Sequence, residues 1–148
     1  MAEGREERGK GRQLFCRVIT PEEIVYDGEA DLVVARIADG DIGVMVDHAP
    51  VVSMVEIGAV RITQDDQRYV FATSDGFFKV SENLVQILVE EAAPPDEIDV
   101  SEAESRVEEA ENELSEIPED DERRKSEVER RRAIGENLAR VAREHSEG

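Results

Sequence analysis

The sequence predicts an α+β protein: an N-terminal antiparallel β-domain, either a sandwich or a closed barrel, followed by an antiparallel hairpin of two helices. Three observations predict this. Apolar residues concentrate between positions 14 and 89 in short runs, Pro94 and Pro95 end this region, and apolar residues then recur at helical spacing. We expect a disordered tail over 1–12, the β-domain over 13–93, a linker over 94–98 and the helical hairpin over 99–148.

Short apolar runs are the evidence for strands. The run 14–19 alternates with a period of two, as a strand with one buried face does. Further strand candidates are 32–37, 42–46, 51–55, 59–63, 69–73, 77–80 and 84–89. Turn residues separate them at Asp27-Gly28, Asp39-Gly40, Gly58, Asp65-Asp66, Asp75-Gly76 and Ser81-Glu82-Asn83. The run 32–35 is apolar at both parities, which predicts burial on both faces or against a second protein.

Two helices are predicted after the prolines. Asp99 is placed to cap the first helix, with Glu102 three residues further on. Its apolar stripe consists of Val100, Ala103, Val107, Ala110, Leu114 and Ile117. The segment 118–121 interrupts the pattern, and a second stripe over roughly 122–143 consists of Val128, Ile134, Leu138 and Val141. Two helices joined by a short break predict an antiparallel hairpin.

The charges divide unevenly along the chain, whose net charge is −19. Residues 96–122 hold fourteen acidic side chains and one basic one, whereas 123–143 hold eight basic and three acidic ones. An antiparallel hairpin therefore lays an acidic helix along a basic one. Exposed ion pairs contribute only about 0.2–1 kcal/mol each, and the apolar stripe is thin, so we expect the hairpin to be marginal and able to open. The acidic surface argues against nucleic-acid binding.

The sequence offers little chemistry for catalysis. Cys16 is the only cysteine, which excludes an intramolecular disulfide and a cysteine metal cage, and we expect it to be buried and inert. A metal-dependent enzyme would require clustered histidines, but the chain has only His48 and His145. There is no nucleophile motif and no phosphate-binding P-loop. No stretch approaches the roughly 18 apolar residues of a membrane span, so membrane association is expected only through a partner.

An ordered series of motifs resembles the ε subunit of the bacterial F-type ATP synthase. The sharpest part is Gly40-Asp41-Ile42-Gly43 followed by Asp47-His48-Ala49-Pro50, which is similar to the family's Gly-x-x-Gly and Gly-His-Ala-Pro elements, with Asp47 where glycine is usual. The segments 18–22, 26–28, 58–62 and 75–80 match at the expected distances. The resemblance extends over residues 13–143.

The resemblance implies a sandwich of about ten strands that binds the γ subunit and the membrane-embedded c-ring. Asp41 matches the position that faces the ring's polar loops in the family. The implied rotor contacts are therefore Asp39, Gly40, Asp41 and Ile42, together with His48, Ala49, Pro50 and Val51. The alternative interpretation is that these residues only form tight turns, and that His48 has a structural or interface role.

The resemblance also implies a regulatory hairpin. In the family it can extend along γ, contact the catalytic α/β subunits and block ATP hydrolysis. The basic residues that could do so here are Arg123, Arg124, Lys125, Arg130, Arg131 and Arg132. Because the same arginines cannot serve two acidic partners at once, we hypothesise that competition between the first helix and the β subunit sets the switch. The alternative is a solvated basic face.

Some members of the family bind ATP through a segment Ile-Asp-x-x-Arg-Ala. Here Ile98, Asp99 and Ala103 fit, but Glu102 replaces the arginine and would repel a triphosphate. We therefore expect no cofactor.

The function implied is a non-catalytic rotor subunit that couples proton translocation to ATP synthesis. It would lie on the cytoplasmic face of the bacterial cell membrane. The alternative is a free-standing scaffold or adaptor with a β-sandwich and a coiled-coil hairpin.

Overall fold

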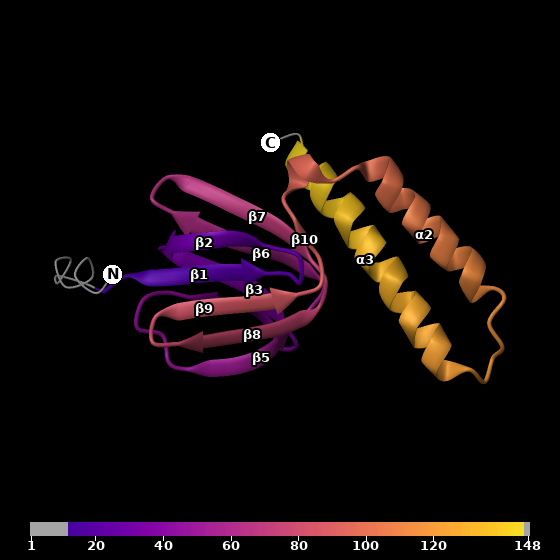
Figure 1. The fold of residues 1–148 in the computed structure, drawn as a ribbon, viewed down its shortest axis with the longest axis horizontal. Helices are drawn as coiled ribbons and strands as arrows, with labels where there is room; N and C mark the ends of the chain where they lie inside the picture. The colour runs from indigo at the N-terminus through magenta and orange to yellow at the C-terminus, as the bar shows by residue number, and fades with distance from the viewer. Residues whose placement is uncertain (1–11, 147–148) are drawn as a thin grey trace. The chain divides into compact units, whose positions relative to one another are not determined.

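The computed structural model describes residues 12–146, and the expectation for the tail 1–11 lies outside them. The chain divides between Ala92 and Ala93 into two compact units. The first unit consists of strands and the second of helices (Figure 1). This arrangement confirms the predicted fold class.

The first unit is a β-sandwich of two five-stranded sheets. One sheet, called here sheet A, has the order β2-β1-β9-β8-β5, and the other, sheet B, has the order β10-β7-β6-β3-β4. The strands are β1 (Leu14–Ile19), β2 (Ile24–Ala30), β3 (Leu32–Ile37), β4 (Gly40–Val44), β5 (Val51–Val55), β6 (Gly58–Gln64), β7 (Gln67–Thr73), β8 (Gly76–Ser81), β9 (Leu84–Val89) and β10 (Ala92–Ala93). Strands β1 and β9 pair in parallel, whereas β1–β2, β3–β4 and β5–β8 are antiparallel.

The predicted turn at Asp27-Gly28 is wrong, because both residues lie inside β2. The chain turns earlier, where the backbone N–H of Thr20 donates to the carbonyl of Glu23 at 2.9 Å. Asp27 lies opposite Arg17 on β1, and their side chains form an ion pair at 3.2 Å. Cross-strand pairing thus overrides the local turn preference of an Asp-Gly pair. The strand predicted over 42–46 likewise begins earlier, at Gly40, and ends at Val44.

The sandwich core lies between the two sheets. Its largest fully buried side chains include Phe78, Leu14, Ile62 and Ile87. At the β2 edge, the ring of Tyr26 packs at a tilted angle against that of Tyr69 of β7, with ring centroids 5.1 Å apart. In the run that is apolar at both parities, Val33 and Ala35 are buried, whereas the alternate positions are only half-buried.

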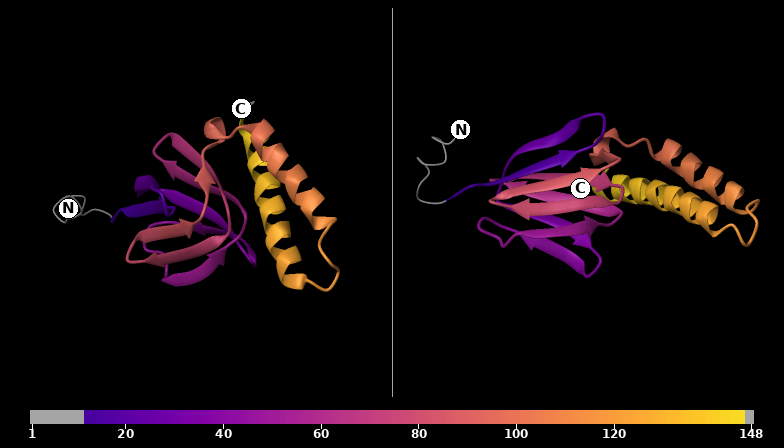
Figure 2. Two further views of the ribbon diagram at one scale, coloured as in Figure 1. Left: turned by 45° about the vertical axis from the view of Figure 1, so that its right-hand side comes forward. Right: turned by 60° about the horizontal axis from the view of Figure 1, so that its bottom comes forward.

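The second unit is a helical hairpin made of α2 (Val100–Leu114) and α3 (Glu122–Ser146), preceded by the short helix η1 (Pro95–Glu97). The two long helices run side by side in every view (Figure 2). Asp99 caps α2 as predicted, since its carboxylate accepts from the backbone N–H of Glu102 at 3.1 Å. Ala110, Ile117 and Val128 form a small buried cluster with Leu114 packed against it.

The hairpin helices approach each other closely at Gly135. A Cβ atom there would lie 3.2 Å from the carbonyl oxygen of Ala103 and 3.0 Å from a methyl carbon of Val107. Small residues on both helices therefore permit the close approach. Within the described residues, no helix is long and apolar enough to cross a membrane.

Candidate docking surfaces and the helical hairpin

The predicted rotor contacts fall into two groups at opposite ends of β4. Gly40 pairs with Ile37 at the turn between β3 and β4, whereas Val44 pairs with Val33 at the far end of the strand. Asp39, Gly40, Asp41 and Ile42 thus belong to the β3–β4 turn end, and His48, Ala49, Pro50 and Val51 to the loop that leads into β5. A five-residue strand spans roughly 17 Å, so the structure does not bring the two groups together.

The β3–β4 turn presents a mostly polar surface. Gly40 has a φ of 119°, which only glycine adopts easily, so the residue is required by the turn itself. Asp39 and Asp41 are exposed, and Asp41 forms an ion pair with Arg36 at 3.2 Å. Ile42 points the other way and packs against the sandwich core. The carboxylates, rather than Ile42, are therefore available for contact with a partner.

The loop 45–50 connects the edge of sheet B to the edge of sheet A. It opens with a turn in which the backbone N–H of His48 donates to the carbonyl of Met45 at 3.2 Å. Asp47 occupies the third position of this turn with a φ of 65°, a left-handed conformation that favours glycine. Met45 and Val46 expose 59% and 40% of their surface. The imidazole Nδ1 of His48 lies 2.6 Å from the carbonyl oxygen of Ala49.

The structure reveals an apolar surface that was missed in the sequence. On the outer face of sheet A, Met54 pairs with Phe77 and Phe77 pairs with Leu88. The same row continues through Ile19 of β1 to Ile24 of β2. Phe77 and Met54 expose 57% and 50% of their surface. This apolar row consists of Ile19, Ile24, Met54, Phe77 and Leu88.

The signal for the apolar row was present but ambiguous. Strands β8 and β9 each carry apolar residues at both parities, as in Phe77-Phe78 and Leu88-Val89. Only the register between strands places the exposed members next to one another. A row of large apolar side chains open to solvent is typical of a surface that binds another protein.

The basic residues of α3 do not form one face. Successive helical residues are about 100° apart, so residues seven positions apart share a side, and the six residues fall into three pairs. Arg124 and Arg131 face α2, where both reach Glu113, at 3.6 Å and 3.1 Å. Lys125 lies 3.8 Å from Glu119, and Arg132 lies 4.0 Å from Glu136 on its own helix. The third pair is Arg123 and Arg130.

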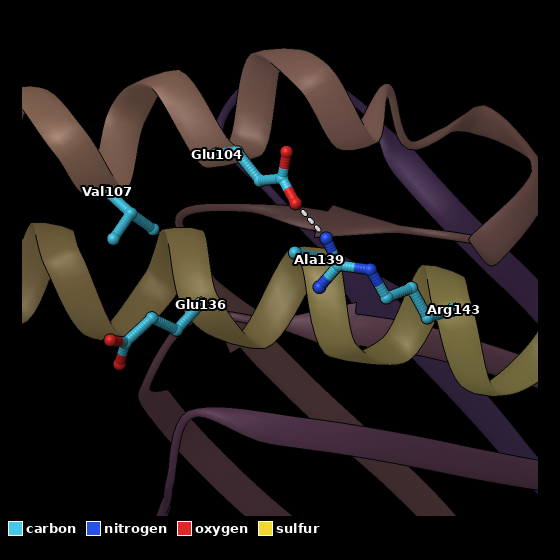
Figure 3. A pocket seen from close by; sticks show the side chains of 5 residues that line it. All are labelled: Glu104, Val107, Glu136, Ala139 and Arg143. Carbon is cyan, nitrogen blue, oxygen red and sulfur yellow. Dashed lines mark hydrogen bonds and ion pairs between the residues drawn. The ribbon is translucent and has the colours of Figure 1, made fainter.

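Glu113 of α2 forms ion pairs with two arginines of α3. Its side chain is 30% exposed, and its two carboxylate oxygens each contact a different arginine. A further inter-helix ion pair joins Glu104 to Arg143 near the other end of the hairpin (Figure 3). The expected alignment of an acidic helix along a basic one is therefore made by these specific contacts.

The three candidate ATP residues have local structural roles. Asp99 caps α2, the N–H of Ile98 donates to the carbonyl of Pro95, and Ala103 is buried. A cavity of about 290 Å³ lies between α2 and α3, but none of the three lines it. Figure 3 shows its lining residues, which are Glu104, Val107, Glu136, Ala139 and Arg143. With two carboxylates, and with its arginine bound to one of them, this cavity is a poor match for a triphosphate.

Two titratable side chains of the sandwich, Cys16 and Tyr26, have raised pKa values. Burial raises the pKa of the Cys16 thiol to about 12, with Asp27 adding to the effect, so the thiol stays protonated and unreactive at neutral pH. Burial also raises the pKa of Tyr26 to about 12. Among residues 12–146 there is no group of three or more histidine, cysteine or acidic side chains that could hold a metal ion.

Comparison with known proteins shows which proteins this chain is similar to. Residues 13–95 match the family model of the ATP synthase, Delta/Epsilon chain, beta-sandwich domain. An ATP synthase epsilon chain from Rubrobacter xylanophilus is 63% identical over 144 residues, covering 95% of this chain and 99% of the relative. One from Brevibacillus brevis is 41% identical over 105 residues, covering 70% and 80%. A chain in the cryo-EM structure of the Euglena gracilis mitochondrial ATP synthase has a TM-score of 0.71 at 23% identity, covering 87% and 81%.

The sandwich and the family model together define the chain as a protein of the delta/epsilon class. The relatives allow a closer assignment, because the match to the Rubrobacter protein extends over both units. The chain belongs to the ATP synthase epsilon chain family. It is accordingly a non-catalytic subunit, which confirms the expectation that it is not an enzyme.

Proposed function

We propose that this chain is a rotor subunit of the central stalk that couples proton translocation to ATP synthesis, and that its hairpin restrains ATP hydrolysis. The observation that carries the first part is the apolar row of sheet A, on a chain whose relatives are named ATP synthase epsilon chain. In this proposal the chain is peripheral, and it reaches the cytoplasmic face of the bacterial cell membrane only through the complex.

The γ subunit is the proposed partner of the apolar row. Side chains such as Phe77 and Met54 are too large and too exposed for a surface that meets only water. Their burial in a stable rotor joint would give about 1.5–3 kcal/mol each. The loop 45–50, with exposed Met45 and Val46, leads into the other end of β5, three residues before Met54, and is proposed as a second part of the γ interface.

The γ contact is tested with Phe77→Ser, because Phe77 lies near the centre of the apolar row. We expect affinity for purified γ subunit to fall by about tenfold to a hundredfold. Lys79→Ser is the matched control, since Lys79 is exposed on the same strand and face two residues further on. Equal affinity of the Phe77 variant and the wild-type chain would argue that γ binds elsewhere.

The c-ring is the proposed partner of the β3–β4 turn. Asp39 and Asp41 present exposed carboxylates at the end of the sandwich opposite the loop 45–50. A polar contact of this kind suits a joint with the polar loops of a membrane ring. The polar character of this turn, in contrast to the apolar row assigned to γ, supports two partners rather than one.

The hairpin is proposed to act as a brake on the catalytic α/β subunits. Arg124 and Arg131 are held by Glu113 in the folded hairpin, so an acidic surface on the β subunit would compete for the same guanidinium groups. Charge reversal of Arg130, Arg131 and Arg132 should then change the inhibited fraction of the enzyme. An unchanged fraction would count against the competition.

The brake is tested by measuring ATP hydrolysis of the assembled complex with the full chain and with a chain ending after Ala93. We expect faster hydrolysis with the truncated chain, provided that gel filtration finds it still bound to the rotor. Hydrolysis at the same rate would confine the role of the chain to coupling through its sandwich. A free-standing scaffold, in contrast, would not co-purify with γ in a fixed ratio.

A further inference from the structure

The loop 45–50 is tied to the β8–β9 turn by a reciprocal pair of hydrogen bonds. The backbone N–H of Asp47 donates to Oδ1 of Asn83 at 2.6 Å, and Nδ2 of Asn83 donates to Oδ1 of Asp47 at 3.2 Å. The same carboxylate oxygen of Asp47 accepts from Arg12 at 3.1 Å. Three segments that are distant in the sequence therefore meet at Asp47.

One side of this pair is rigid. Glu82 and Asn83 form the two-residue turn between the paired residues Ser81 and Leu84, with φ angles of 52° and 62°. Two successive positive φ angles are the pattern of a type I′ hairpin turn, in which asparagine is favoured. The carbonyl of Asn83 also accepts from the N–H of Phe15 on β1 at 2.9 Å. The Asn83 side chain thus projects from a fixed point on sheet A.

The other side of the pair is a loop under local strain. Asp47 has a φ of 65° at a position where glycine would fit without cost. Aspartate tolerates this conformation better than most residues, but glycine tolerates it best. Glycine, however, would leave Asn83 without the carboxylate that its amide group binds. Aspartate is therefore more strained than glycine at this position, but its carboxylate accepts a hydrogen bond from Asn83 and so connects the loop to sheet A.

We propose that Asp47 and Asn83 form a latch that holds the loop 45–50 in its docking conformation before the partner arrives. This rests on the proposed function, in which that loop binds the γ subunit. A loop ordered in advance loses less conformational entropy on binding, so the latch raises affinity without touching the partner. Asp47 and Asn83 are positioning residues in this scheme, and Met45, Val46 and His48 make the contact.

The latch is tested first in the free chain by hydrogen exchange. In Asn83→Gly the amide of Asp47 loses its acceptor, so we expect it to exchange about three- to tenfold faster, as the loss of one exposed hydrogen bond implies. Glu82→Gly is the matched control, because it places glycine at a left-handed position in the same turn and leaves both latch residues intact. Unchanged exchange at Asp47 in Asn83→Gly would overturn the latch.

The effect on docking is tested by the affinity of each variant for purified γ subunit. We expect Asp47→Gly and Asn83→Gly each to weaken binding about three- to tenfold, and the double variant to weaken it no further, because both remove one coupled unit. Asp47→Asn keeps an oxygen acceptor and should bind nearly as the wild type does.

The outcomes separate the two proposals. Wild-type affinity in both glycine variants, with faster loop exchange, would overturn the docking role of the latch and leave the proposed function standing. Failure of the wild-type chain itself to bind γ would overturn the proposed function and the docking role with it, whereas the exchange experiment would still decide whether the latch exists.

Discussion

At the scale of single residues, the backbone requires glycine at two positions, Gly76 and Gly40. Gly76 lies opposite Val89 where β8 and β9 pair, and a Cβ atom on Gly76 would overlap the carbonyl oxygen of Leu88. Leu88 and Val89 both belong to β9, which is hydrogen-bonded to β8, so neither can move aside without breaking this pairing. The requirement for glycine here comes from close approach, whereas at Gly40 it comes from a positive φ.

We predict that Gly76→Ala lowers the free energy of unfolding by roughly 1–3 kcal/mol, because the added methyl group has no space. Urea unfolding followed by circular dichroism measures the change. Gly43→Ala is the control, since its Cβ would meet only the flexible end of Leu32 at 3.6 Å. Equal stability of the two variants would contradict the close approach at Gly76.

A second residue-scale prediction concerns alkaline pH. Burial raises the pKa of Cys16 from 9.0 to about 12. Because the unfolded thiol loses its proton first, this contribution to stability is fully present below pH 9 and is lost as pH rises through 9 toward 12. In that window we expect the unfolding free energy to fall by up to about 1.4 kcal/mol per pH unit. Cys16→Ala should have a shallower slope there, while Tyr26, with a pKa of about 12, contributes to both proteins. Parallel slopes would exclude Cys16 as the cause.

At the scale of elements, the hairpin is held by few contacts. Its buried apolar cluster is small, and Glu113 supplies two of its inter-helix ion pairs. Such contacts weaken with salt, so the balance between a closed and an open hairpin depends on ionic strength.

We predict that Glu113→Gln destabilises the hairpin by about 0.5–1 kcal/mol at low salt and has a smaller effect at high salt. Hydrogen exchange of the α2 and α3 amides measures the opening directly. Glu109→Gln makes the same change in net charge at an exposed α2 position and serves as the control. An effect that does not vary with salt would indicate that Glu113 acts through packing instead.

At the scale of the whole molecule, the two units have separate interiors. The sandwich core is made from residues between Leu14 and Val89, and the hairpin cluster from Ala110, Leu114, Ile117 and Val128. We therefore predict that a chain ending after Ala93 folds by itself and unfolds in one cooperative step. Thermal unfolding followed by circular dichroism and dispersion of amide resonances by NMR test this. Gradual melting without a transition would contradict it.

Much of the fold of this protein could be predicted from its sequence. The period of two in β1, the two prolines and the helical stripes predicted the order and type of the elements, because these signals are local. The motif Gly40-Asp41-Ile42-Gly43, with Asp47-His48-Ala49-Pro50 after it, identified the family, which the comparisons confirm. Local preference failed at Asp27-Gly28, where pairing with β1 outweighs the turn tendency of the two residues.

The tertiary structure alone decided how surface residues are grouped. The apolar row crosses four strands of sheet A from Met54 to Ile19, and the Asp47–Asn83 pair joins positions 36 residues apart. The three pairs of basic residues on α3 became distinguishable only when Glu113 was placed opposite one of them. Each of these groups depends on strand register or helix pairing, and those are set by the packing of the core rather than by the residues that the packing brings together.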